Sequence, residues 1–557
     1  MATAPSLALR SLLTSVLRDT GLQSPHQHVS GATPPVRALA IAAAAKRLSE
    51  GVILLVVPTD SDIDGACGDI SFFLSVLEGS AATVVERQVL PFPSTQVDPY
   101  RGFQPHLKVA SARARVLHAL ATGTARVVVA SAAALLTRLP EPASVLLSSC
   151  EVKPGIDIDP HELANTLVLG GYEPADPVDA HGEFARRGGI FDVFPAGEEL
   201  PIRIEFIGDM VESIRRFDPG TQRSIETLDR FGIVPVREGA TDPSGAGSLT
   251  ATLFQFLRTR DTQTWLSEPT DVKAHIREAW EHVSVSYADA IERAKGLEPP
   301  RPLDLLVGED ELSAELSAAI ALEELALDSV EDAPGRLAVS VQPTSTFHGR
   351  IPDWIADTKA ALANGDRIVF VAGSHGRAER AIELLKDYDV RAVAATDAGD
   401  VTRGAVVVVE GWLSKGFRLR TPASSGEPTD PPGAFLIYAE TDVFDEERRK
   451  GSPGKKRSAS AAFLSDLRDL KVGDLIVHVD HGIGQFVGLK QISVASGDVV
   501  QEFLELRYHG DAKLFVPVER LDLIQKYTGG AKPPLDRLGG TTWDCLLYTS
   551  PSPRDQR

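Results

Sequence analysis

The first 150 residues alternate between unbroken apolar runs and helical periodicity. Residues 51–58 (GVILLVVP) form a β-branched run that ends at a proline, which predicts a strand buried on both faces. Residues 106–123 carry small and aliphatic side chains at helical spacing, and the run RVVVASAAALL that follows predicts a second buried strand. Strand, helix and strand in this order indicate an α/β layer structure.

From about residue 170 the pattern changes to alternation with a period of two, as in PIRIEFIGDMVESIRRFDPGTQRS. Such alternation predicts antiparallel strands with one buried face, and Gly208 with Asp209 stands where a hairpin could turn. Pleat geometry directs three apolar side chains toward the core: Ile202, Ile204 and Phe206. The same geometry puts Arg203 and Ile207 together on the opposite face, where an arginine beside an aliphatic residue is typical of a binding surface.

Three further patterns follow along the chain. Residues 236–340 are mostly helical in pattern, whereas residues 341–447 alternate strands with amphipathic helices, which predicts a small α/β domain with a parallel sheet. Residues 448–470 begin with the polar, basic segment RRKGSPGKKRSAS, which is typical of an exposed linker. Residues 471–530 contain short β-runs such as DLIVHV and EFLELRY, whose spacing fits a small Tudor-like or SH3-like β-barrel.

The length, composition and net charge of the chain restrict the classes of function that it can have. The chain has 557 residues, 43% of them apolar and 24% charged, so we expect several globular domains, and no apolar run approaches the roughly 18 residues that span a bilayer. The cysteines show no pairing or metal spacing, which indicates a cytoplasmic protein; they are Cys67, Cys150 and Cys545. The net charge of −20 argues against a protein that grips DNA over its whole surface and favours protein partners.

The N-terminal segment MATAPSLALRSLLTSVLRDT has two possible interpretations. It bears arginines and few acids, as a transit peptide does, but its apolar residues also suit one face of a helix that docks on a domain. The apolar stretches are short and Asp19 interrupts them, so we favour the docking helix.

The sequence contains no candidate catalytic or metal centre. The phosphate-binding loop GxxxxGK[ST] is absent, and the run 51–58 is followed by TDSDIDGACGD, whose acids would repel a triphosphate, so we expect no ATP hydrolysis and no cofactor. His478 and His481 lie three apart across a predicted turn without a third ligand nearby, which favours a structural role over metal binding. The basic residues within 448–457 could steer DNA, although a solvated linker is the simpler interpretation.

Two segments resemble a known family. GEFARRGGIFDVFPAG, RIEFIGDMVESIRRFDPGTQRS and IVPVRE are similar to the domain shared by bacterial transcription-repair coupling factors and the B subunit of the excision nuclease. VGDLIVHVDHGIGQFVGLKQI and EFLELRYHGDAKLFVPVERLDLIQKYTGG resemble the RNA-polymerase-interacting module of coupling factors and of CarD-like regulators. Because both occur in one chain and in this order, the chain resembles the N-terminal half of a coupling factor.

The resemblance implies a multi-domain α/β and α+β architecture in which a degenerate helicase-like α/β domain holds an inserted α+β domain. The expected segments are, in order, 1–149 (helicase-like, first part), 150–235 (inserted domain), 236–340 (helicase-like, second part), 341–447 (small α/β domain), 448–470 (linker), 471–530 (CarD-like barrel), 531–544 (connector) and 545–557 (artefact). The last segment starts with CLLYTSPSPRD, which is the translation of a common transposon sequencing adapter, so we exclude Cys545–Arg557 from any function.

The resemblance also implies partners. The excision-nuclease A subunit would contact Arg187, Arg203 and Ile207, and the β subunit of RNA polymerase would contact Leu489 and Ile492. In the whole family an ATP-driven translocase motor follows, so ATP, Mg²⁺ and most of the contact with double-stranded DNA are expected in a part that this sequence lacks. The family's C-terminal domain is thought to mask the A-subunit surface, so we expect this chain to bind the A subunit constitutively.

Two other functions compete with this interpretation. An excision-nuclease B subunit would share the inserted domain, but it would carry a phosphate loop and no barrel. A stand-alone CarD-like transcription regulator would share the barrel, but it would not need the first 240 residues.

Overall fold

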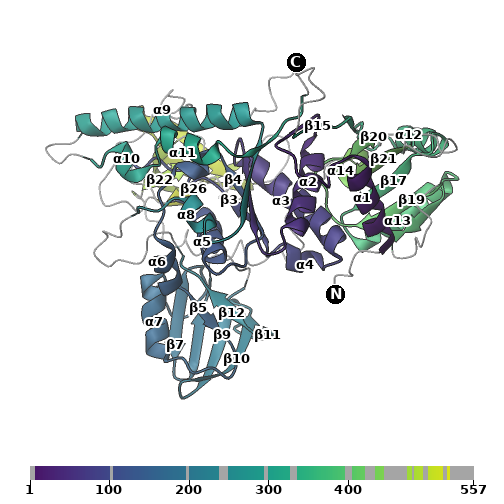
Figure 1. Cartoon of the computed structure of the whole chain (residues 1–557). Coiled ribbons are helices and arrows are strands. Elements are labelled where there is room, and N and C mark those ends of the chain that lie inside the picture. The colour runs from purple at the N-terminus through teal and green to yellow at the C-terminus, as the bar shows by residue number, and fades with distance from the viewer. Residues whose placement is uncertain are drawn as a thin grey trace. The chain divides into compact units, whose positions relative to one another are not determined.

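The computed structural model divides the chain into two units, Met1–Arg449 and Lys450–Arg557, which are described separately (Figure 1). The structure describes residues 7–100, 105–195, 198, 200–236, 249–293, 299–325, 335–395, 404–420, 433–444, 473, 475–478, 482–493, 500–517 and 524–526. Among these residues, no helix combines the length and the apolar content that crossing a membrane requires.

A seven-stranded parallel sheet forms the centre of the first unit, in the order β15-β1-β14-β13-β2-β4-β3. The strands are β1 (His28–Ser30), β2 (Val52–Val57), β3 (Val89–Phe92), β4 (Val127–Ser131), β13 (Thr262–Ser267), β14 (Ile320–Leu322) and β15 (Arg336–Ala338). The two buried strands predicted from their apolar runs are confirmed as β2 and β4. The sequence missed β1, because three residues of mixed polarity give no periodic signal.

Helices cover both faces of this sheet, and β2 contributes to both cores. Ile53, Leu55 and Val57 pack with α1, α2 and α3, whereas the alternate residues of β2 pack with α5, α8, α9 and α11 on the other face. This is the arrangement that a continuous apolar run predicts. The helices are α1 (Leu7–Asp19), α2 (Pro34–Arg47), α3 (Ser61–Glu78), α4 (Ala82–Val85), α5 (Leu107–Ala121), η1 (Ala133–Leu136), α6 (Pro142–Leu147), α8 (Leu253–Leu257), α9 (Pro269–Arg293), α10 (Pro302–Leu305) and α11 (Glu309–Leu316). The predicted docking helix is confirmed as α1, which buries five apolar residues.

A second domain is inserted in the chain between β4 and β13. It has a six-stranded sheet in the order β11-β10-β9-β8-β7-β6 and a two-stranded sheet of β12 and β5. The helix α7 (Pro160–Leu169) packs Leu163 and Leu167 into the core of this domain. The strands are β5 (Cys150–Val152), β6 (Glu173–Pro174), β7 (Glu183–Arg187), β8 (Ile190–Val193), β9 (Ile202–Ile207), β10 (Met210–Phe217), β11 (Ser224–Thr227) and β12 (Phe231–Ile233).

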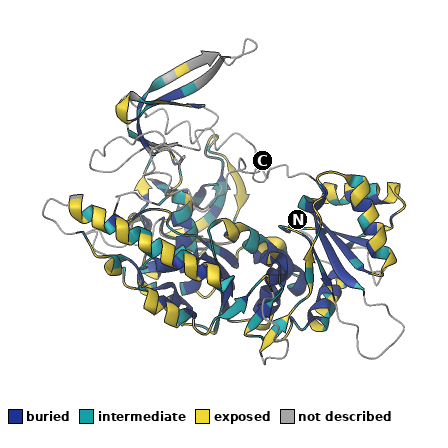
Figure 2. Cartoon of the chain, turned by 90° about the horizontal axis from the view of Figure 1, so that it is seen from above, coloured by how far each residue is buried: buried dark blue, intermediate teal, exposed yellow. Residues whose placement is uncertain are grey.

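The third domain of the first unit has a six-stranded sheet in the order β16-β20-β21-β17-β19-β18. Its central strands are buried, as Figure 2 shows, and α12 (Ile351–Ala363), α13 (His375–Asp387) and α14 (Glu440–Val443) belong to the same domain. The strands are β16 (Val341–Pro343), β17 (Arg367–Ala372), β18 (Ala392–Ala394), β19 (Val406–Glu410), β20 (Phe417–Arg420) and β21 (Ala434–Ala439). The expected all-parallel sheet was wrong in part, since β16 and β20 pair antiparallel at one edge.

A tight joint connects this third domain to α3. The carboxylate of Asp69 accepts hydrogen bonds from the backbone nitrogen of Ser414 at 2.6 Å and from its hydroxyl at 2.5 Å. A Cβ on Gly68 would lie 2.0 Å from the ring of Trp412, and one on Gly411 would lie 2.6 Å from the ring of Phe72. The two elements therefore approach more closely than side chains at these glycines would allow.

The second unit contains a five-stranded antiparallel sheet in the order β25-β24-β23-β22-β26. Its small core includes Phe486, Leu504 and Tyr508. The strands are β22 (Leu475–His478), β23 (Gly482–Ser493), β24 (Val500–Arg507), β25 (Lys513–Pro517) and β26 (Ile524–Lys526). The Tudor-like barrel stays a prediction, because the described residues establish the sheet but not its closure.

Candidate protein-binding surfaces

The strand β9 has the two faces that its sequence predicts. Ile202, Ile204 and Phe206 are buried in the core of the inserted domain, and Ile207 is 57% exposed. Arg203 and Glu205 share the face of Ile207, since side chains alternate along a strand. Arg203 and Ile207 therefore lie on the face that the alternation predicts, and their individual surroundings decide what each can do.

Arg203 is held by its own domain. Its Nε and Nη2 donate to the two oxygens of Asp192 at 2.7 and 2.8 Å, and its side chain is only 15% exposed. Further hydrogen bonds reach the backbone oxygen and the side-chain oxygen of Gln222, and the guanidinium lies 4.5 Å from the ring centre of Phe217. The hydrogen bonds to Asp192 and the charges of Asp192 and Glu205 raise the pKa of Arg203, although burial opposes the shift. Together, the hydrogen bonds to Asp192 and Gln222 hold the guanidinium in place. They use four of the five N–H groups of the guanidinium, so at most one is left for a partner.

Arg187 lies in a different environment on the same sheet. It forms an ion pair with Asp176, and the two side chains are 41% and 68% exposed. Because solvent screens an exposed pair, separating it costs about 1 kcal/mol or less. Arg187 is therefore free to exchange Asp176 for a carboxylate of another protein.

The structure adds two exposed apolar residues that sequence analysis did not select. Ile190 on β8 and Met210 on β10 are 38% and 39% exposed. In the register of the sheet, Ile190 lies opposite both Arg187 and Glu205, and Met210 lies opposite Ile207. The sequence could have pointed to both residues, because each borders a glycine turn of the alternating segment. Their exposure, however, depends on how far the buried core of the domain extends toward these turns.

The second candidate surface lies in the smaller unit. The strand β23 carries both predicted residues, with Leu489 opposite Leu504 and Ile492 opposite Gln501 of β24. The side chains of Leu489 and Ile492 lie outside the described part of the chain, so their contact with a partner stays a prediction. Beside them, Glu505 is buried between Lys490 and Lys513 at 2.9 and 2.8 Å, and these bonds lower its pKa.

The carboxyl end of the large parallel sheet is the place where α/β folds bind phosphates. The loop that joins β1 to α2 reaches this end, and α2 begins with Pro34 and Pro35, which have no N–H to donate to a phosphate. The first strand–helix turn of the sheet is therefore residues 31–33, because β1 precedes the run 51–58. The acidic segment TDSDIDGACGD follows β2, as the sequence predicts, and does not occupy this first turn.

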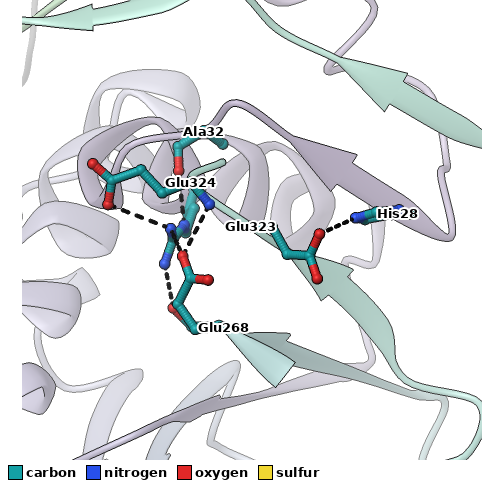
Figure 3. A network of polar contacts seen from close by, with 7 residues as sticks. His28, Ala32, Glu268, Glu323 and Glu324 are labelled. Carbon is teal, nitrogen blue, oxygen red and sulfur yellow. Dashed lines mark hydrogen bonds and ion pairs between the residues drawn. The ribbon is translucent and has the colours of Figure 1, made fainter. Parts of the chain in front are cut away.

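Arg37 is the fourth residue of α2 and is only 6% exposed. Figure 3 shows the polar network of this region, with Ala32, Glu268 and Glu324 close together and His28 beside Glu323. The guanidinium of Arg37 donates to the backbone oxygen of Ala32 at 2.8 Å and the hydroxyl of Ser267 at 2.7 Å, and it pairs with the carboxylates of Glu268 and Glu324. Two carboxylates thus neutralise the guanidinium, with which a bound phosphate would otherwise pair.

Asp60, at the end of β2, also belongs to this edge of the sheet. It accepts hydrogen bonds from the backbone and hydroxyl of Ser94 at 2.8 and 2.5 Å and from the amide of Gln96 at 3.1 Å. Burial alone would raise the pKa of Asp60, but the hydrogen bonds outweigh it and hold the pKa below its usual value. The carboxylate therefore keeps its negative charge, which disfavours an anion here.

No cluster of three or more metal-ligating side chains occurs within the described ranges. His481 lies outside those ranges, and of His478 only the backbone, at the end of β22, is described. The interpretation of these two histidines as structural residues accordingly stays a prediction. The basic segment 448–457 and the segment 545–557 also lie outside the described residues.

Comparisons with known proteins identify the same two regions. The family described as the UvrB interaction domain matches residues 150–238, and the CarD-like/TRCF RID domain matches residues 470–528. Over 84% of the length of this chain, it is 28% identical to the transcription-repair-coupling factor of Bacillus subtilis. Over 88% of its length, it is 28% identical to that of Myxococcus xanthus. It is 26% identical to that of Escherichia coli over 84%. The chain spans less than half the length of these relatives, with 43%, 45% and 43% of them covered.

Proposed function

We propose, from the similarity of this chain to the N-terminal part of transcription-repair-coupling factors, that it is an adaptor between transcription and DNA repair. Residues 471–530 would bind the β subunit of a stalled RNA polymerase, and residues 150–235 would recruit the excision-nuclease A subunit. The observation that carries the proposal is the presence of both matched domains in one chain in this order.

The inserted domain supports binding of the A subunit. Its matched family is named for UvrB interaction, and the outer face of its sheet exposes aliphatic residues beside an arginine that has only an exposed partner. This combination gives an apolar contact and a charged contact at one surface, as protein interfaces require. Among the predicted residues, Ile207 and Arg187 fit a direct contact, and Arg203 fits a role inside the domain.

The smaller unit supports binding of RNA polymerase. Its matched family includes the CarD-like domain, and its antiparallel sheet presents strands to which a segment of another protein could pair. Leu489 and Ile492 remain the proposed contacts on β23. A stand-alone CarD-like regulator would account for this unit, but it would leave the 84% extent of the similarity without an explanation.

The large parallel sheet fits a helicase-like domain that has lost the ability to bind a nucleotide. The prolines at the start of α2 and the enclosure of Arg37 support the absence of ATP hydrolysis in this chain and disfavour the alternative of an active excision-nuclease B subunit. ATP-driven translocation, Mg²⁺ and the main contact with double-stranded DNA would belong to a motor outside this sequence. We place the protein in the cytoplasm, where its proposed partners act.

The test is a binding experiment with two purified partners. We expect the chain to retain RNA polymerase and the excision-nuclease A subunit independently, without ATP. Ile207→Asp should reduce capture of the A subunit by at least tenfold and leave capture of the polymerase unchanged, and Ile492→Asp should do the reverse. Failure of the folded wild-type chain to capture either partner would overturn the adaptor function, and ATP hydrolysis by the chain would favour the B-subunit alternative.

A further inference from the structure

Residues 439–444 connect β21 of the third domain to the part of the chain that leads to the second unit, and we call them the exit segment. The strand before them lies inside the sheet, because β21 pairs parallel with β17 on one side and antiparallel with β20 on the other. A pull along β21 therefore loads two ladders of hydrogen bonds at once. Those bonds must break together rather than one after another.

Asp442 joins three parts of the third domain within the exit segment. Its Oδ2 accepts hydrogen bonds from the backbone nitrogens of Gly416 and Ala439 at 2.8 and 2.9 Å and from the hydroxyl of Thr344 at 2.9 Å. The residue is only 4% exposed, and a Cβ on Gly416 would collide with the same oxygen, so glycine alone fits there. One buried carboxyl group thus ties the loop after β16, the start of β20 and the end of β21.

Further contacts hold the residues on either side of this carboxyl group. The backbone oxygen of Asp442 accepts a hydrogen bond from the nitrogen of Phe347 at 2.6 Å. The ring of Phe444 lies 6.5 Å from the rings of Trp354 and Phe370, measured between ring centres. The last described residue of the first unit is therefore packed against α12 and β17.

The start of the exit segment is bonded to the turn between β17 and α13. The carboxylate of Glu440 accepts a hydrogen bond from the backbone nitrogen of Gly373 at 2.6 Å and pairs with Arg377. The last residues of a domain are usually poorly ordered unless they are tied down. Here successive residues are tied to separate segments, which is more than fixing one chain end requires.

A short series of hydrogen bonds continues from the exit segment to α3. The hydroxyl of Thr441 donates to the backbone oxygen of Ser414 at 2.9 Å, and Ser414 donates in turn to the carboxylate of Asp69. The third domain and α3 also share one hydrophobic core, in which the rings of Phe73 and Phe417 lie 6.4 Å apart. A displacement of the exit segment is therefore resisted by α3 as well as by the third domain.

We propose that the exit segment is a mechanical anchor that passes load from the second unit to the third domain and α3. The load rests on the proposed function, because it arises when the second unit holds an RNA polymerase that moves relative to the first unit. The inserted domain leaves the chain between β4 and β13 and contributes none of the contacts named above. Its binding surface consequently keeps its shape while the anchor is under tension.

The experiment holds the full chain by its two ends in optical tweezers and records each lengthening step at constant force. At ~3.4 Å per residue, unfolding of residues 473–526 lengthens the chain by roughly 18 nm and unfolding of residues 341–444 by roughly 35 nm. We expect the shorter step first, because the sheet of the second unit has only a small core. The tension then acts directly on the exit segment.

Two variants test whether the exit segment resists this tension. Thr441→Val keeps the shape of the side chain, loses the bond to Ser414, and should raise the rate of the longer step roughly threefold to tenfold. Asp442→Ala loses three hydrogen bonds and should raise that rate roughly thirtyfold or more. Glu383→Gln, at an exposed position of α13, is the control and should change the rate by less than about twofold.

Unchanged rates of the longer step in both variants would show that the exit segment bears no load and would overturn the proposal. An equal acceleration in Glu383→Gln would overturn it too, as would a wild-type chain whose third domain unfolds before its second unit. If circular dichroism shows that Asp442→Ala does not fold, Thr441→Val decides. No partner takes part in this measurement, so its failure leaves the adaptor function standing. Absence of partner capture would defeat that function and leave the measured rates unchanged.

Discussion

Arg203 and Arg187 lie on the same face of the inserted sheet, yet their surroundings give them different roles. Asp192, the partner of Arg203, is only 2% exposed, whereas Asp176, the partner of Arg187, is 68% exposed. Removing one member of a buried pair leaves an uncompensated charge in a medium of low dielectric constant. Removing one member of an exposed pair leaves a charge that water solvates.

We therefore expect Arg203→Met to lower the free energy of local unfolding around β8 and β9 by about 3 kcal/mol. Arg187→Met, the matched control, should lower it by less than about 1 kcal/mol. Hydrogen–deuterium exchange of peptides from residues 183–217 measures both effects without requiring the whole chain to unfold in two states. Unchanged exchange in Arg203→Met, together with lost affinity for the A subunit, would instead make Arg203 a direct contact.

At the scale of elements, β1, the loop after it and α2 keep the geometry of a phosphate-binding turn, but they lack the groups that would bind a phosphate. The helix points its N-terminus at the carboxyl edge of the sheet, but prolines occupy its first positions and carboxylates neutralise Arg37. The groups that a nucleotide would contact are thus satisfied by the protein. Arg37 donates from three separate nitrogens to three different partners, whereas a lysine ammonium offers all its donors from a single nitrogen.

For this element we expect Arg37→Lys to destabilise the sheet edge by about 2 kcal/mol, because lysine cannot reach Ala32, Ser267 and Glu268 together. It should create no affinity for ATP, although lysine is the usual residue of a phosphate loop. Hydrogen exchange of residues 28–45 and titration with a fluorescent ATP analogue measure the two expectations. Arg47→Lys, at an exposed position at the end of α2, is the control, and ATP binding by Arg37→Lys would contradict the prediction.

At the scale of the whole molecule, the joint between α3 and the third domain depends on a buried carboxyl group. Burial raises the pKa of Asp69 to about 7, although the hydrogen bonds from Ser414 oppose this shift. In the unfolded chain the same group titrates near pH 4. Between these values the folded chain holds a proton that the unfolded chain has released, so stability falls as the pH rises from about 4 to 7.

We expect Asp69→Asn to remove this pH dependence. The amide keeps an acceptor for Ser414 and cannot ionise, so the stability of the variant relative to the wild type should increase between pH 5 and pH 8 by on the order of 2 kcal/mol. Hydrogen exchange of residues 406–417 at the two pH values, corrected for intrinsic rates, gives the comparison. Asp64→Asn, at an exposed position of the same helix, is the control. A relative stability that falls between the two pH values would show that the charged form stabilises the joint.

The sequence by itself determined the local elements wherever a pattern was long and periodic. The apolar run of β2, the amphipathic α1 and the alternation of β9 each specify one arrangement, because burial of their apolar side chains is possible in that arrangement alone. The motif resemblance also brought Arg187, Arg203 and Ile207 to one face of one sheet. No tertiary information was needed for these conclusions.

Only the tertiary structure decided what these residues contact. It paired Arg203 with Asp192, left Arg187 and Ile207 exposed, and brought Ile190 and Met210 beside Ile207 across two hairpins. It also revealed β1, a three-residue strand that exists because β14 and β15 pair with it on both sides. The periodicity of a sequence gives the direction in which each side chain points from its own helix or strand. The exposure and the contacts of that side chain depend on segments that are distant in the sequence, and a local pattern does not specify them.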